Sequence, residues 1–106
     1  MPAQTENPVL ETIGAITAAS LGRSDLPADA LLMVRIAALA AVDARPISYL
    51  AHVGPALESG VTIEDVQNVL VTVAPIIGTA RTMSAAVNIS EALGFAIAVL
   101  EESSVE

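Results

Sequence analysis

The sequence predicts an all-α fold, a single-domain bundle of about five helices. Alanine and leucine dominate its apolar stretches, and no alternating run of apolar and polar residues is bounded by hairpin signals. Proline, glycine and capping residues divide the 106 residues into five helical stretches with short connections. A chain of this length holds one domain, which we expect to span residues 1–106.

The first helix is expected to begin after Asn7, a good N-cap residue, with Pro8 at its first position. Gly22 is expected to end it. Its apolar face would carry Val9, Ile13 and Ile16.

The second helix is predicted over about 27–42, opened by Pro27. It is apolar nearly all round, which favours burial on several sides. Arg35 lies inside it, and an unpaired cation there would be costly. We therefore expect Arg35 to form a structural ion pair or, alternatively, to face a cavity and bind a ligand.

The third helix is expected to begin at Asp43, whose carboxylate can cap free N–H groups, and to end at Ser59 and Gly60. Pro55 lies in its last part, so a kink or an early end near Gly54 is predicted.

The fourth helix is predicted to begin with a capping box formed by Thr62 and Asp65, and to end around Gly78. The fifth would start after Thr79 and run to about Leu100, followed by a frayed acidic tail over 101–106. The residues expected to face the core are Val66, Val69, Leu70 and Val73 in the fourth helix, Met83 and Phe95 in the fifth, and Met33 in the second.

Composition excludes several classes of function. Twelve acidic residues face four arginines, for a formal charge of −8, so the clustered cations that nucleic acid binding requires are missing. The absence of cysteine excludes thiol chemistry and thiolate metal sites. No apolar run is long enough to span a membrane, and residues 1–12 lack a basic signal-peptide region, so a cytoplasmic protein is expected.

No metal or cofactor is expected, because the single histidine and the scattered acids form no metal-binding motif and there is no glycine-rich phosphate loop. Fifty-four per cent of the residues are apolar, more than a domain of this size can bury. Self-association is the simplest way to cover the remainder.

One face of the third predicted helix is a candidate ligand site. Arg45, Ser48, Tyr49 and His52 are spaced by three, four and seven positions, which places them on one side of a helix. His52 would move a proton, Arg45 and Arg81 would hold an anion, and the hydroxyl groups of Ser48 and Tyr49 would donate hydrogen bonds. Alternatively, Tyr49 and His52 are packing residues, Arg45 is solvated, and Arg81 forms a salt bridge.

Three segments within residues 26–93 carry a resemblance to known proteins: LLMVRIAALAAV, YLAHVGPALESGVTIEDVQNVL and APIIGTARTMSAAVNISEAL. In the order and spacing of these segments, the chain resembles the carboxymuconolactone decarboxylase and alkyl hydroperoxidase D-like family. The resemblance implies an all-helical fold around an antiparallel helix pair, and homo-oligomers that are commonly trimers or hexamers.

The family's two chemistries transfer unequally to this chain. The peroxidase branch has a Cys-x-x-Cys pair where this chain has Arg45 and Ser48, and a glutamate near the position of Met33, so peroxidase activity by that mechanism is excluded. The decarboxylase branch places a histidine at the position of His52, usually with a glutamate one turn earlier, where this chain has Ser48.

These observations favour a cofactor-independent lyase or isomerase that acts on a small organic acid or lactone by His52-assisted proton transfer. The alternatives are a catalytically inert homo-oligomeric binding or scaffold protein of the same fold, and a helical adaptor that docks another protein through an exposed apolar face.

Overall fold

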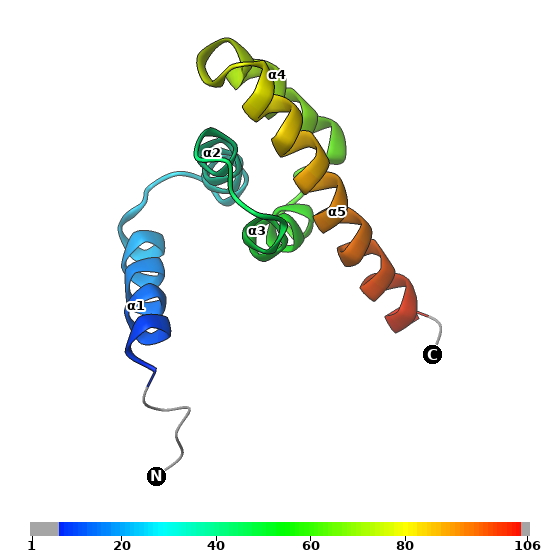
Figure 1. The fold of residues 1–106 in the computed structure, drawn as a ribbon. Coiled ribbons are helices and arrows are strands. Elements are labelled where there is room, and N and C mark those ends of the chain that lie inside the picture. Colours follow the sequence, from blue (N-terminus) through cyan, green and yellow to red (C-terminus); the bar gives the residue numbers. More distant parts are fainter. Residues whose placement is uncertain (1–6, 105–106) are drawn as a thin grey trace.

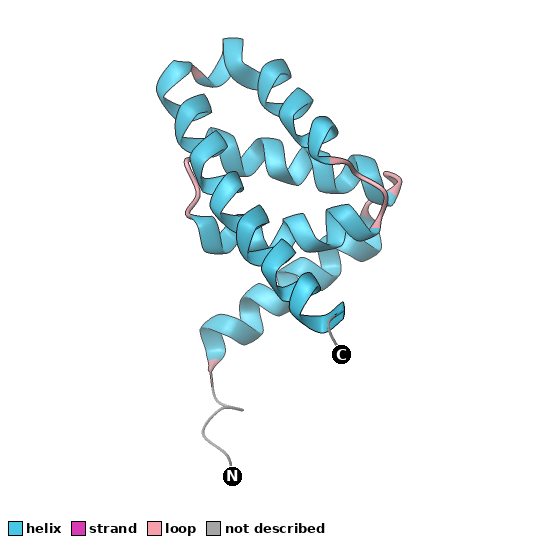
Figure 2. Ribbon diagram, turned by 90° about the vertical axis from the view of Figure 1, so that its right-hand side faces the viewer, coloured by secondary structure: helices cyan, strands magenta, loops and turns pink. Residues whose placement is uncertain are grey.

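A computed structural model describes residues 7–104, with side chains described for residues 7–94. The described chain is all-α, as predicted. Its five helices, shown in Figures 1 and 2, are α1 (Pro8–Arg23), α2 (Ala28–Ala41), α3 (Pro46–Glu58), α4 (Ile63–Ile77) and α5 (Thr79–Ser104). Helices α2 to α5 pack against one another, whereas α1 extends away from them (Figure 1).

The beginning of α1 follows the prediction. The Asn7 side chain accepts a hydrogen bond from the Leu10 amide at 3.1 Å, and Pro8 occupies the first helical position. The helix ends at Arg23, one residue beyond the expected Gly22. The apolar face predicted for this helix is exposed along its whole length.

The connection between α2 and α3 corrects the prediction for Asp43. Asp43 adopts a left-handed conformation, with φ of 56°, and lies just after the end of α2. The Asp43 amide donates to Ala40 O and the Ala44 amide to Leu39 O, a Schellman motif that closes α2. Asp43 therefore ends α2 and does not cap α3, which begins at Pro46 with Arg45 as its N-cap residue.

The end of α3 was predicted correctly, but the early end that was one of the two effects expected of Pro55 does not occur. The Val61 amide donates to Ala56 O, the Gly60 amide donates to Leu57 O, and Gly60 has φ of 95°, so a second Schellman motif ends the helix. Val61 is buried against the core in this motif. The helix continues through Pro55 to Glu58, so the predicted early end near Gly54 is wrong.

Helix α4 begins with the predicted capping box. The Asp65 amide donates to Thr62 Oγ1 and the Thr62 amide donates to Asp65 Oδ2, each at 2.9 Å. Gly78 alone joins α4 to α5, and the chain reverses direction there (Figure 1). Helix α5 continues beyond the expected Leu100 to Ser104, and residues 105–106 lie outside the described part.

The core lies where α2, α3, α4 and α5 meet. Its fully buried members include Ile36 of α2 and Tyr49 and Val53 of α3. Helix α2 packs against α3, α4 and α5, so it is buried on several sides as predicted, and Val34, 57% exposed, lies on its open side. Met83 is 62% exposed and not in the core, Met33 is half-buried, and the Phe95 side chain lies outside the described residues. No helix in the described part is both long and apolar enough to cross a membrane.

Candidate functional site

His52 is held in one orientation by its own helix. Its Nδ1 atom lies 2.9 Å from the carbonyl oxygen of Ser48, one turn earlier in α3. A carbonyl oxygen only accepts, so Nδ1 carries the proton and donates it. In the neutral ring, Nε2 is then the unprotonated nitrogen, and it has no hydrogen-bond partner among the residues whose side chains are described. The half-buried imidazole is therefore oriented by Nδ1 and leaves Nε2 unoccupied by those residues.

Tyr49 lies in the core, apart from the half-buried flank of α3 that carries Ser48 and His52. Its side chain is 0% exposed, and its Oη has no hydrogen-bond partner within the described part of the chain. Burial, with a smaller contribution from the Asp43 carboxylate, raises the pKa of the Tyr49 phenol. A buried hydroxyl without a partner destabilises the folded state, since it has lost its hydrogen bonds to water.

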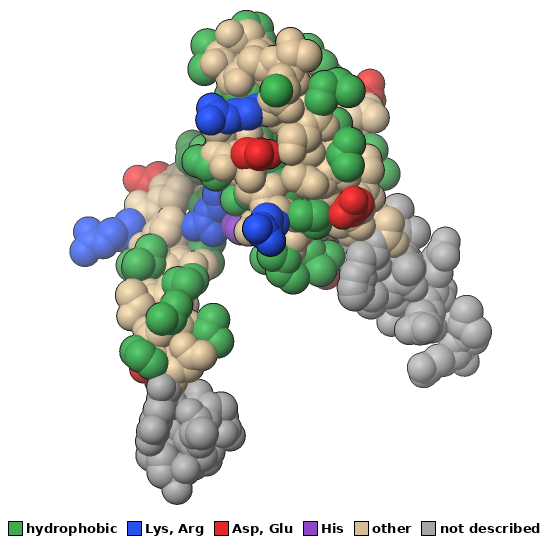
Figure 3. Space-filling view, viewed as in Figure 1, with side chains coloured by type: hydrophobic (Ala, Val, Ile, Leu, Met, Phe, Trp, Pro, Cys, Tyr) green, Lys and Arg blue, Asp and Glu red, His purple; other side chains and the backbone are tan. Residues whose placement is uncertain are grey.

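The three arginines that sequence reasoning singled out occupy different places. Arg45 is exposed just before the first turn of α3, and Arg81 is exposed in the first turn of α5. Arg35 is half-buried, and its Nη2 donates to Ser20 Oγ of α1 at 2.8 Å, whereas no ion pair of Arg35 is found among residues 7–94. Figure 3 shows the imidazole on the face turned to the viewer, with basic side chains on either side of it in that view.

Sequence reasoning missed a polar cluster that ties the start of α3 to α5. Ser84 Oγ donates to Asp43 Oδ1 at 2.6 Å, and Asn88 Nδ2 donates to Ala44 O at 3.0 Å. Ser84 and Asn88 are four residues apart and therefore lie on one face of α5. This spacing of two polar residues was the signal in the sequence that could have indicated the cluster. The cluster holds the Asp43 carboxylate close enough to Tyr49 to contribute to the raised pKa of the Tyr49 phenol.

Three hollows on the surface lie away from the predicted site. One lies between α2 and α4, a second beside the linker from α1 to α2, and a third between α3 and α5. None of these three is lined by His52, Ser48, Arg45 or Arg81. Within residues 7–94, no three histidine or acidic side chains come close enough together to hold a metal ion.

Replacing Tyr49 with phenylalanine is expected to leave the free energy of unfolding unchanged or to raise it by about 1–2 kcal/mol, because the unpaired hydroxyl is removed and the ring is kept. The native state keeps the phenol proton to a higher pH than the unfolded state does. The wild type should therefore lose stability as the pH rises above ~10, the ordinary phenol value.

Urea unfolding at neutral and alkaline pH measures both effects, and Tyr49→Phe should lack the alkaline loss that arises from the phenol. Tyr49 is the only tyrosine and the chain has no tryptophan, so phenolate absorbance reports on this residue alone. A loss of 2 kcal/mol or more in Tyr49→Phe, on the order of a broken buried hydrogen bond, would show that the hydroxyl has a partner.

The chain matches the model of a known protein family. The model described as "Carboxymuconolactone decarboxylase family" matches residues 8–92, which is most of the chain. No curated protein and no solved structure matches the chain.

Proposed function

Because the chain belongs to the carboxymuconolactone decarboxylase family, we propose that it is a cofactor-independent lyase or isomerase acting on a small organic acid or lactone. His52 moves the proton in this proposal. The histidine is the chain's only one, and it stands where the resemblance to the decarboxylase branch places the catalytic histidine.

The observation that carries the proposal is the hydrogen bond from His52 Nδ1 to Ser48 O. This bond orients the ring and leaves Nε2 free to take a proton from the carbon next to a carbonyl group. The electron pair released from that bond moves to the carbonyl oxygen, which becomes an enolate. Return of the proton to another carbon completes an isomerisation. In a decarboxylation, the carbon–carboxylate bond breaks, CO2 departs, and the electron pair moves to the carbonyl oxygen as an enolate. His52, which has taken a proton from water, then supplies that proton to the carbon.

Charge stabilisation is assigned to the arginines. Arg45, at the start of the helix that carries His52, would hold the substrate carboxylate or the enolate oxygen, with Arg81 as a second cation. Ser48 would donate a hydrogen bond from the flank that it shares with His52. Tyr49 would contribute through its unpaired hydroxyl only where a substrate oxygen reaches into the core.

A second candidate is a catalytically inert, homo-oligomeric scaffold of the same fold. It is favoured by the number of large apolar side chains that one chain leaves exposed, among them Val42, Ile47, Val71 and Ile76 at 70% or more. A trimer or hexamer, as the family resemblance implies, would cover such side chains. The presence of Ser48 where the decarboxylase branch has a glutamate also favours this candidate.

A thermal-shift screen against small lactones and mono- and dicarboxylic acids tests the enzyme proposal. A ligand that binds only the folded state at about ten times its Kd adds ~1.4 kcal/mol, which raises the Tm by about 5–10 °C in a domain of this size. The shift should shrink in His52→Gln. The matched control is Ala51→Gln, which places the same side chain at the exposed neighbouring position.

The two candidates differ in the pattern of shifts. A shift that is present in the wild type and Ala51→Gln but reduced in His52→Gln supports a ligand site at the histidine. No shift with any compound in the wild type, or equal shifts in all three proteins, contradicts it and favours the scaffold.

A further inference from the structure

Helix α1 carries an apolar stripe that the described part of the chain leaves uncovered. Val9, Ile13 and Ile16 follow one another at helical spacing, and their side chains are 65%, 53% and 63% exposed. The hydrogen bond from Arg35 of α2 to Ser20 joins the two helices near the C-terminal end of α1. An isolated helix of 16 residues is marginally stable in water, so α1 requires a partner surface.

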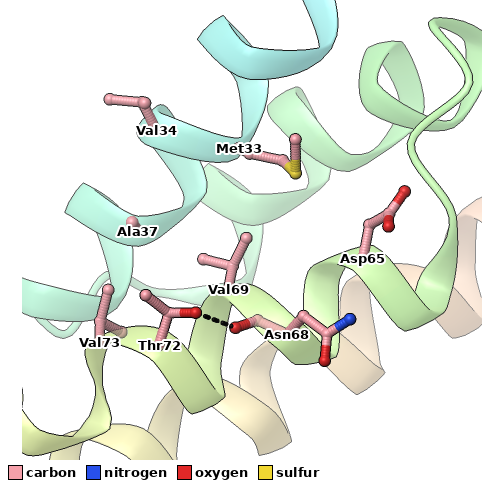
Figure 4. A pocket seen from close by; sticks show the side chains of 8 residues that line it. All are labelled: Met33, Val34, Ala37, Asp65, Asn68, Val69, Thr72 and Val73. Carbon is pink, nitrogen blue, oxygen red and sulfur yellow. Dashed lines mark hydrogen bonds between the residues drawn. The ribbon is translucent and has the colours of Figure 1, made fainter.

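An apolar groove of about 300 Å³ lies between α2 and α4 (Figure 4). Met33 and Ala37 line it from α2, and Val69 and Val73 line it from α4. Asp65, at one end, is the only charged side chain in the lining. The groove therefore offers apolar surface of the kind that the α1 stripe requires.

The α1 helix of the same chain lies on the other flank of α2. Each residue of an α-helix turns by about 100°, so residues two apart point in nearly opposite directions. Arg35, which contacts Ser20 of α1, is two residues from Met33 and two from Ala37. The linker over residues 24–27 leaves α1 on this side, so α1 does not lie in the groove of its own molecule.

We propose that α1 of one copy of this chain docks into the α2–α4 groove of a second copy, so that each copy gives one helix and receives one. Charge favours α1 as the occupant. The chain has a formal charge of −8, which makes copies repel, whereas residues 7–23 carry only Glu11 and Arg23 and are neutral overall. Charge also sets the orientation of the docked helix. With the C-terminal end of α1 at the Asp65 end of the groove, Arg23 lies beside the Asp65 carboxylate.

Size exclusion with light scattering on the full chain tests the exchange. Ile13→Glu adds a charge to the middle of the stripe, at a position that a single copy leaves exposed, so the helices of the variant stay folded. The wild type is expected to have a mass of at least two chains, and Ile13→Glu the mass of one. Ala15→Glu is the matched control, because it places the same charge on the opposite side of α1 and should keep the wild-type mass.

Mixing two variants separates exchange from other kinds of association. Ala37→Glu places the charge in the groove and leaves α1 intact, so this variant should also have the mass of one chain. A mixture with Ile13→Glu combines an intact α1 with an intact groove, and a two-chain species is expected. If circular dichroism shows that Ala37→Glu has lost helix, Thr72→Glu, exposed on the same groove, takes its place.

Three results would each overturn the exchange. The first is a wild type with the mass of one chain at micromolar concentration, which would leave α1 free or folded back on its own molecule. The second is an Ile13→Glu variant with the wild-type mass. The third is a mixture of Ile13→Glu and Ala37→Glu in which every species has the mass of one chain.

Discussion

His52→Gln is expected to lower kcat by about 100- to 10,000-fold on a ligand identified by thermal shift, because removal of a general acid or base has an effect of this size. This loss corresponds to a barrier higher by ~3–5 kcal/mol. Glutamine is close to histidine in size and keeps a polar N–H group, but its amide does not take up or release a proton at neutral pH. Steady-state kinetics, with circular dichroism to verify the fold, make the measurement.

Ala51→Gln is the control for this experiment as well, and it should keep kcat within a factor of about two, as expected for an exposed position that touches no reacting group. KM should change less than kcat in His52→Gln, since the proton transfer is made in the transition state. Wild-type turnover by a folded His52→Gln would remove His52 from the mechanism.

Ile36→Ala is expected to lower the free energy of unfolding by about 2–5 kcal/mol. Ile36 of α2 is 0% exposed, so truncation removes apolar contacts and leaves a cavity between helices. A domain of this size has about 5–15 kcal/mol of stability in total, and the loss is a large fraction of it. Urea unfolding at a fixed protein concentration should show a lower midpoint.

Ile76→Ala provides the matched control for Ile36→Ala. It is the same substitution at a helical position that is 86% exposed in one chain, and it should change the free energy of unfolding by about 0.5 kcal/mol or less. Equal losses in the two variants would contradict the assignment of Ile36 to the core and of Ile76 to the surface.

Local signals predicted the helix boundaries that depend on local contacts. The Asn7 cap and the Thr62–Asp65 capping box are confirmed, and each joins residues three positions apart. Gly60 closes α3 for the same reason, because its motif spans one turn. Within the candidate site, the pairing of Ser48 with His52 is also local, four residues apart on one helix.

Two of the wrong predictions concern residues with partners far away in the chain. Asp43 closes α2 through backbone hydrogen bonds within one turn, and its carboxylate, expected to cap α3, instead accepts a hydrogen bond from Ser84 on α5. Met83 fits a core position by composition, yet the way α5 packs leaves it at the surface.

The sequence by itself determined the all-α class, the family and the lone histidine, because composition, helical period and capping act over a few residues. Only the tertiary structure decided that Tyr49 lies in the core while Ser48 and His52 share an accessible flank, and that the α1 stripe is left uncovered. Helical spacing assigns residues to a face, but the side of a helix that is buried depends on which other helices pack against it.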